Sequence, residues 1–352
     1  MVILLLTRLP YSTAFISSLH AGNSIQDILL AVPINFLLNF LLAAPILLLM
    51  SRHPGKDMLE IADQIGGRGL TVVLGIVYLA GFLCVAVLPI DYFQNFYTNS
   101  IIPESLFFGI AIPLLLVCVY AAIRGVEGLA RLGTLVLIAY LIDVLFIVGT
   151  VVPSVHLEYL LPQLYNGPGV LEKAVLIGAN SSFQIVLLSF LAPFLHSHEK
   201  PARLFARWNV IAAIVLLYLQ FMVVTVLGAF GSEQVFPLYV LSRRSGLGVF
   251  DRLEAAELIS WIMETVFEIA VFIYIAYTCL TRMGLNKYRR TVTFVIGAVL
   301  LGAGRVTYRR LMQTRYIGDN PWVTAGMILT VLVIPLGLLL ADTVRRKAGQ
   351  KT

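Results

Sequence analysis

The sequence predicts an all-α polytopic membrane protein with about ten transmembrane helices in a 5+5 inverted repeat, and three observations support this class. Of the 352 residues, 59% are hydrophobic and only 12% are charged, whereas a soluble domain has about 25% charged residues. The mean hydropathy of +0.91 is typical of a chain built from membrane helices. The polar connections are each shorter than about 30 residues, which is too short for a separate folded domain. We therefore expect a single transmembrane permease-like domain over residues 1–352.

Ten apolar segments are long enough, or almost long enough, to cross the hydrocarbon core, which requires about 20 helical residues. The first is expected to be a membrane helix and not a signal peptide, because a basic n-region and a cleavage site are missing. The segments divide into a first repeat of about residues 1–153 and a second of about residues 174–341. The expected segments are 2–20, 27–51, 70–97, 106–123, 129–153, 174–195, 207–229, 255–281, 291–308 and 322–341.

Lysine and arginine are distributed unequally between the two sides of this arrangement. With the N-terminus in the cytoplasm, roughly twice as many basic residues fall inside as outside, which favours cytoplasmic positions for both termini. Two connections are predicted to be more than linkers. Residues 52–69 have apolar positions at helical spacing, as in a short helix along the membrane interface. Residues 230–252 are apolar enough to fold back over the outer mouth of the protein.

The first segment of each repeat is interrupted by polar residues near its middle. In lipid every backbone N–H and C=O group needs a partner, so irregular backbone is tolerated only inside protein or beside a water-filled cavity. Broken helices at corresponding positions of two halves mark the binding site of many transporters. The alternative is that glycine and serine only let two helices approach closely. The interrupting residues are Pro10, Tyr11, Ser12 and Thr13 in the first segment and Gly178, Asn180, Ser181, Ser182 and Gln184 in the sixth.

Two glutamates lie in the apolar eighth segment, where ionisable groups are costly and usually face the bundle interior or a water-filled path. Glu264 and Glu268 are four residues apart and therefore on one helical face. Two carboxylates this close disfavour a second negative charge, so the pair can keep a proton at neutral pH. That would suit a proton-linked step or a contact with a cationic ligand. The alternative is that one of them forms a fixed structural pair with Arg8 or another basic group.

Two aspartates are also drawn into apolar segments. Asp91 lies near the expected outer end of the third segment, so we expect it to be solvated. Asp143 in the fifth segment has no local partner, which predicts a functional or packing role across helices.

If the first and sixth segments unwind at their interruptions, they form a site for a small molecule. Freed N–H groups can bind a carboxylate and freed C=O groups can bind an ammonium, which are the two charges of an amino acid. Tyr78 and Phe82, one turn apart in the third segment, would form a wall of this site, although aromatic residues at this spacing more often belong to a hydrophobic core. The expected ligand-binding residues are Ser12, Thr13, Tyr78, Phe82, Gly178, Asn180, Ser181, Ser182, Gln184, Glu264 and Glu268.

Other classes of function lack their usual signals in this sequence. No nucleophile–base–orienter set, Gly-rich phosphate loop or metal-ligand spacing is visible, so we expect no enzyme, no metal site and no cofactor. The net charge of +6 needs no nucleic acid, because membrane proteins keep basic residues in their cytoplasmic loops. The expected environment is a lipid bilayer.

Several motifs occur in order along the chain. They are His53–Lys56, Pro103–Ser105, Tyr120–Leu132, Leu160–Gly167, Phe236–Leu241, Asp251–Ala255 and Trp261. Together they resemble the endospore germination permeases, which are the B subunits of nutrient germinant receptors within the amino acid–polyamine–organocation transporter superfamily. Family members often have glycine and glutamate where this chain has Phe183 and Gln184, and lysine where it has Glu268.

The resemblance implies a membrane subunit of a spore nutrient-germinant receptor in the spore inner membrane. Such a subunit would bind a small germinant, such as an amino acid, at mid-membrane and signal through a larger A subunit and a lipoprotein C subunit. A second hypothesis is an active secondary transporter of amino acids or organic cations coupled to H⁺ or Na⁺. A third is a structural subunit that has lost ligand binding, which the altered residues in the sixth and eighth segments leave open.

Overall fold

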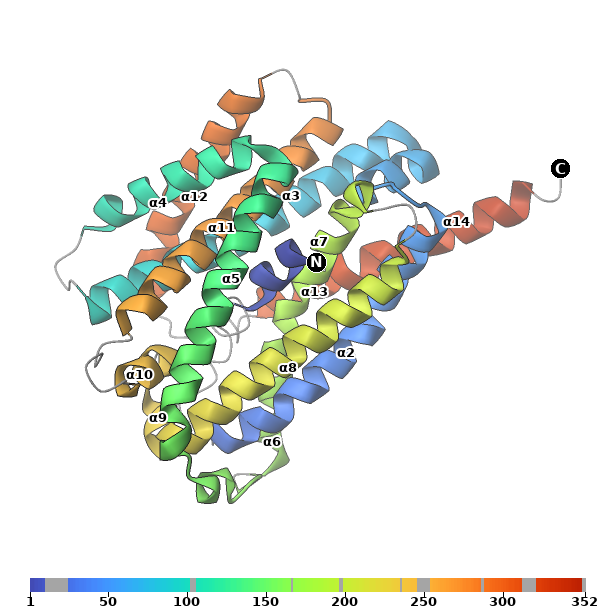
Figure 1. Ribbon diagram of the computed structural model, residues 1–352. Coiled ribbons are helices and arrows are strands. Elements are labelled where there is room, and N and C mark those ends of the chain that lie inside the picture. Colours follow the sequence, from blue (N-terminus) through green and yellow to red (C-terminus); the bar gives the residue numbers. More distant parts are fainter. Residues whose placement is uncertain are drawn as a thin grey trace.

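The computed structural model shows a bundle of helices, with no strand among the residues that it describes (Figure 1). Eight described helices are long and apolar enough to cross a membrane, and one further apolar helix is shorter. The expected class, an all-α polytopic membrane protein, is therefore confirmed. The described residues are 1–9, 25–101, 106–165, 167–195, 199–234, 236–245, 254–285, 288–311 and 321–349.

Expected segments two to ten each coincide with described helices. Of segment one, residues 2–9 are helical, whereas Pro10, Ser12 and Thr13 lie outside the described residues. The main helices are α2 (Ile25–Arg52), α3 (Met58–Ser100), α4 (Phe107–Ile123), α5 (Gly125–Val151), α6 (Pro168–Ala179), α7 (Ile185–Phe190), α8 (Pro201–Leu227), α11 (Glu254–Arg282), α12 (Arg289–Leu311), α13 (Pro321–Ile328) and α14 (Ile334–Gly349).

The short helix expected between residues 52 and 69 is present as the start of α3. The Asp57 carboxylate accepts hydrogen bonds from the backbone N–H groups of Leu59 at 3.0 Å and Glu60 at 2.9 Å. The Glu60 side chain in turn accepts from the N–H of Asp57, which completes a capping box. Gly67, with φ 72° and ψ −172°, then separates this short helix from the long apolar part of α3. Only glycine adopts that backbone conformation without strain.

The connection at residues 230–252 folds back onto the bundle, as expected, in its described part. It forms α9 (Ala229–Glu233) and α10 (Pro237–Arg244), and α10 packs against α8 and α11. The Phe96 ring of α3 lies edge-on to Phe236 at 5.0 Å, to Tyr239 at 4.8 Å and to Trp261 at 4.4 Å between centroids. Edge-to-face aromatic packing of this kind holds α10 against α3 and α11.

Helices at corresponding positions of the two expected repeats pack against each other. The packing is most extensive between α3 and α11, and α2 lies along α8 while α4 packs on α12 (Figure 1). A two-fold axis between the halves would bring these pairs together. The 5+5 repeat itself stays a prediction.

Residues 2–9 form a short helix in the middle of the bundle (Figure 1), and Val2 lies close to Gly133 of α5. Leu4, Leu6 and Leu9 are at most 2% exposed. The indole N–H of Trp208 in α8 donates a hydrogen bond to the Leu4 carbonyl at 2.7 Å. The core of the protein is therefore assembled around this first segment.

Candidate functional site

The α-helix of segment six is interrupted at the residues where the sequence predicted an interruption. α6 ends at Ala179, residues Asn180–Gln184 form a 3₁₀ helix, and α7 begins at Ile185. The expected unwinding is not seen, because Asn180 keeps helical angles of φ −61° and ψ −25°. The helix tightens here instead of opening. A stretch of 3₁₀ helix within a longer helix often marks a functional hinge.

Segments one and six meet at this 3₁₀ helix. The Arg8 guanidinium donates a hydrogen bond to the Ser181 carbonyl and lies over the Phe36 ring, 5.1 Å from its centroid. The Gln184 side-chain amide donates to the Thr7 carbonyl. Arg8, Ser181 and Gln184 are all at most 3% exposed. The first segment is thus tied to the sixth by polar groups in the interior of the bundle.

A chain of neutral side chains leads away from the 3₁₀ helix into α2 and α8. The Ser182 hydroxyl donates to the Asn39 side-chain oxygen at 2.6 Å, and the Asn39 amide donates to the Asn209 oxygen at 3.2 Å. The Asn209 amide donates to the Phe36 carbonyl at 2.8 Å. All four residues are buried. A buried polar network whose members are paired fixes the relative positions of the helices that carry them.

Gly178 allows α2 to approach α6 closely. A Cβ atom added at Gly178 would collide with the side-chain amide of Asn35 in α2. The small-residue interpretation of Gly178 is therefore supported by the geometry. Sequence reasoning missed Asn35, Asn39 and Asn209 as parts of this region. The available signal was a pair of asparagines four residues apart, on one face of an otherwise apolar helix.

Tyr78 and Phe82 lie beside segment six, as the sequence predicted. The ring of Tyr78 contacts Phe190 at 5.4 Å, and the ring of Phe82 contacts Phe183 at 5.2 Å and Phe190 at 5.2 Å between centroids. Both α3 residues are completely buried. Tyr78 and Phe82 form an aromatic wall along segment six, which packs on Phe183 of the 3₁₀ helix and on Phe190 of α7. These two residues therefore serve as core packing and as a wall at the same time.

The Tyr78 hydroxyl joins the wall to the last helix. It donates a hydrogen bond to the Thr330 carbonyl at 3.2 Å. Thr330 belongs to a π-helical turn, Leu329–Val333, between α13 and α14. A π turn shifts the backbone ladder and is frequent at functional sites. Two of the irregular helical turns in the described chain therefore border the same aromatic wall.

Glu264 and Glu268 point into the bundle interior, where the structure places them 4% and 1% exposed. No ion pair involves either residue within the described part of the chain, so the predicted alternative of a fixed pair is not seen there. Phe272, four residues beyond Glu268 on the same face of α11, contacts Phe82 with centroids 6.4 Å apart. The carboxylates therefore lie next to the aromatic wall along α11.

The expectation of a solvated Asp91 is wrong. Asp91 is only 5% exposed, because α12 packs against α3 at this level and Thr307 of α12 lies beside the carboxylate. The position near a helix end did not reveal the neighbouring helix.

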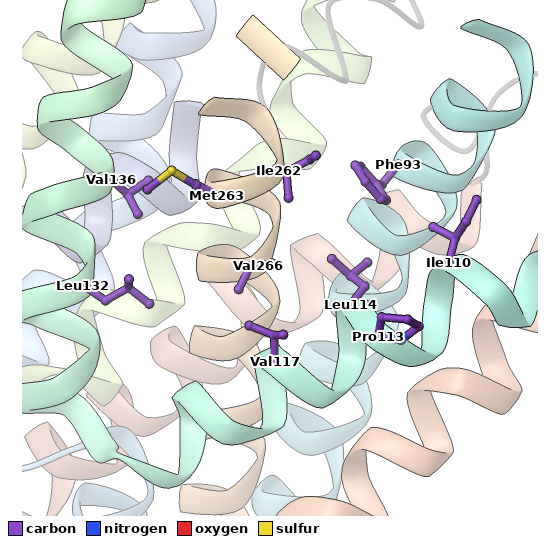
Figure 2. A pocket seen from close by; sticks show the side chains of 10 residues that line it. All are labelled: Phe93, Ile110, Pro113, Leu114, Val117, Leu132, Val136, Ile262, Met263 and Val266. Carbon is purple, nitrogen blue, oxygen red and sulfur yellow. The ribbon is translucent and has the colours of Figure 1, made fainter. Parts of the chain in front are cut away.

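A cavity of about 480 Å³ lies away from the 3₁₀ helix, between α3, α4, α5 and α11 (Figure 2). Its wall is apolar, so it offers no charge to either end of an amino acid. Figure 2 shows the side chains that converge on it from α4, α5 and α11. The lining residues are Phe93, Ile110, Pro113, Leu114, Val117, Leu132, Val136, Ile262, Met263 and Val266.

Comparison with known proteins finds one family. The family model described as spore germination protein matches residues 2–310, which is most of the chain and includes every described residue of the meeting point between segments one and six. No curated protein matches the chain significantly.

Proposed function

This chain belongs to the spore germination protein family, and we propose that it is the membrane subunit of a spore nutrient-germinant receptor. Membership gives it a role in germination or in germinant-related transport, within a family of permease-like membrane proteins and not of enzymes. In the proposed assembly it works with an A subunit and a lipoprotein C subunit in the spore inner membrane, with both termini in the cytoplasm.

The observation that carries the proposal is the meeting of Arg8 with the 3₁₀ helix of segment six. A buried guanidinium can bind a carboxylate through two parallel hydrogen bonds. The carbonyl groups of Thr7 and Ser181 lie at the same place and can accept hydrogen bonds from an ammonium group. These groups suit an amino acid, whose two charges would replace the contacts that now join segments one and six.

In the described arrangement the proposed site is closed to solvent. Binding must therefore change the structure, which gives the site a signalling role. Arg8, Ser181, Ser182 and Gln184 are buried among protein groups, so a germinant must separate segment one from segment six to bind. A ligand shifts such an equilibrium only as far as it prefers the open state. The Ser182–Asn39–Asn209 chain would carry the separation to α2 and α8, and from there to the partner subunits.

Germination assays on spores with two tryptophan variants test the site. Ser182→Trp fills the buried meeting point, whereas Ile214→Trp adds the same side chain on α8 at a position that is 63% exposed. With equal amounts of both variants in the membrane, we expect Ser182→Trp to abolish the response to the germinant and Ile214→Trp to keep it. A normal dose response in Ser182→Trp spores would exclude this site.

A secondary transporter is the second candidate, and the buried carboxylates of α11 favour it because ion-coupled carriers need such groups. Uptake of labelled amino acids by the protein alone in liposomes would support the carrier. Absence of uptake, together with loss of germination on gene deletion, would support the receptor.

A further inference from the structure

A row of carboxylates follows one face of α11 toward the aromatic wall. Glu257, Glu264 and Glu268 are separated by seven and four residues, which places them on a common helical face. Asp143 of α5, 4% exposed, lies beside Glu257 and close to Glu264. Within the described part of the chain, both carboxylate oxygens of Asp143 and one oxygen each of Glu264 and Glu268 are buried without a hydrogen-bond partner. Four acidic groups thus line the contact between α5 and α11.

Tyr140 is an independent sign that this contact holds something more than the four side chains. It lies three residues before Asp143, so both residues are on the same face of α5. Its side chain is 8% exposed, and its hydroxyl is buried with no hydrogen-bond partner among the residues that the structure describes. The hydroxyl interacts electrostatically with Glu264, Glu257 and Asp143. The Tyr140 hydroxyl and several carboxylate oxygens therefore share one interior region, and in the described part of the chain this hydroxyl donates to none of them.

Three cationic groups of the bundle contact groups outside this row of carboxylates. Arg244 of α10 donates to the Val226 carbonyl, and Arg305 of α12 lies over the Phe107 and Phe108 rings. Arg8 contacts Ser181 and Phe36. The titratable and charged groups on the elements packed against α11 are Glu60, Asp63, Arg68, Tyr78, Cys84, Asp91, Tyr92 and Tyr97 on α3, Cys118 and Tyr120 on α4, Glu127, Arg131, Tyr140 and Asp143 on α5, Tyr239, Arg243 and Arg244 on α10, and Arg289, Arg290, Arg305, Tyr308, Arg309 and Arg310 on α12.

We infer that the α5–α11 contact is a proton-binding site, at which Asp143, Glu257, Glu264 and Glu268 share exchangeable protons with Tyr140 at its edge. Burying several unpaired carboxylates in ionised form is prohibitively costly, whereas a protonated carboxyl is neutral and gains an O–H donor. A divalent metal does not fit, since no three His, Cys, Asp or Glu side chains converge as a metal site in the described chain. Ionisable groups inside a membrane bundle commonly hold or relay protons.

The site is placed to influence segment six without forming part of the proposed germinant site at Arg8. Glu268 is one turn from Phe272, which contacts Phe82, and Phe82 contacts Phe183 in the 3₁₀ helix. Loss of a proton from the row would put a charge beside this packed path. The inference goes beyond germinant binding, because the protons would be held whether or not a germinant binds.

Infrared difference spectroscopy of the purified full chain during pH steps tests the site directly. We expect a C=O band of a protonated carboxyl group at neutral pH, shifted in D₂O and lost on alkalinisation. Glu264→Gln and Asp143→Asn should each reduce this band. Glu127→Gln should leave it unchanged, because Glu127 is 78% exposed and paired with Arg131. Absence of the band at neutral pH, or a full band in both buried variants, would overturn the site.

Two further measurements distinguish proton binding from a packing role and from binding of a monovalent cation. Glutamine imitates a protonated glutamate. At alkaline pH, Glu264→Gln should therefore unfold at a higher temperature than the wild type, and at acidic pH the two proteins should unfold at the same temperature. An equal difference in unfolding temperature at both pH values would make Glu264 a packing residue.

Replacing choline by Na⁺ at neutral pH should leave the infrared band of the protonated carboxyl group in place. Disappearance of this band in Na⁺ would assign the cluster to a monovalent cation instead of a proton.

Discussion

The Arg8 guanidinium donates its hydrogen bond to the Ser181 main-chain carbonyl, across 173 positions of sequence. This contact joins the segment that opens the chain to the 3₁₀ helix of segment six, inside the membrane bundle. The Phe36 ring beneath Arg8 holds the planar guanidinium in place, since arginine stacks on aromatic faces. The identity of this side chain therefore matters beyond its charge.

Arg8→Lys keeps the positive charge but loses the planar fork that can bind a carboxylate with two hydrogen bonds. We expect a right-shifted germinant dose response of about tenfold or more, which corresponds to about 1.4 kcal/mol of binding. Germination rates of spores across germinant concentrations measure it. Arg131→Lys is the matched control, because Arg131 is 80% exposed and paired only with Glu127 at the surface. Equal shifts in the two variants would remove Arg8 from the site.

Gly178→Ala tests the close approach of α2 and α6. The added methyl group collides with the Asn35 side-chain amide, so this side chain must leave its present position or the two helices must move apart. Overpacking of this kind costs about 1–3 kcal/mol, and the thermal unfolding temperature of the purified protein should fall. Gly169→Ala adds the same methyl group to α6, where no atom lies within 4 Å. If both variants unfold at the same temperature, the approach at Gly178 does not determine stability.

We expect the Asp57 carboxyl at the start of α3 to make the free energy of unfolding depend on pH. Burial raises the pKa of the Asp57 carboxyl above its ordinary value of 3.8, although the Glu60 N–H and Arg282, 2.7 Å away, act in the opposite direction. A raised pKa in the folded state means that stability from this group is present at low pH and is lost as pH rises through the folded value.

Asp57→Asn removes this titration and keeps an oxygen that can cap the helix. The free energy of unfolding of the variant, relative to the wild type, should therefore increase as pH rises from about 3 to about 6. Thermal unfolding of the purified proteins over that range measures the difference. A constant difference between Asp57→Asn and the wild type over that range would contradict the effect of burial.

The membrane helices could be predicted because each apolar run is itself the signal, independent of its neighbours. The interruption at Asn180–Gln184 could be located for the same reason, from polar residues within one segment. Its geometry could not, because Arg8, Asn39 and Thr7 supply partners that let the helix tighten instead of unwind. The prediction for Asp91 failed for the same reason, because its burial depends on Thr307 and its neighbours in α12, which lie far along the sequence.

Asn39 and Asn209 provide the sharpest test of the polar chain beside segment six. Asn39→Leu alone leaves the Asn209 oxygen and the Ser182 hydroxyl buried without their present partner. Such a loss costs about 1–3 kcal/mol. Asn209→Leu alone removes the hydrogen bonds that the Asn39 amide and the Phe36 carbonyl now form with Asn209, and each loss has a cost of the same size.

The double variant Asn39→Leu/Asn209→Leu removes both amides together, so fewer polar atoms stay unpaired than the two single variants imply. We expect its loss of unfolding free energy to be smaller than the sum of the two single losses by about 0.5–3 kcal/mol. Thermal or denaturant unfolding of the four proteins completes the cycle. Strict additivity for Asn39 and Asn209 would mean that their hydrogen bond does not couple α2 to α8, and the proposed route from segment six to these helices would fail with it.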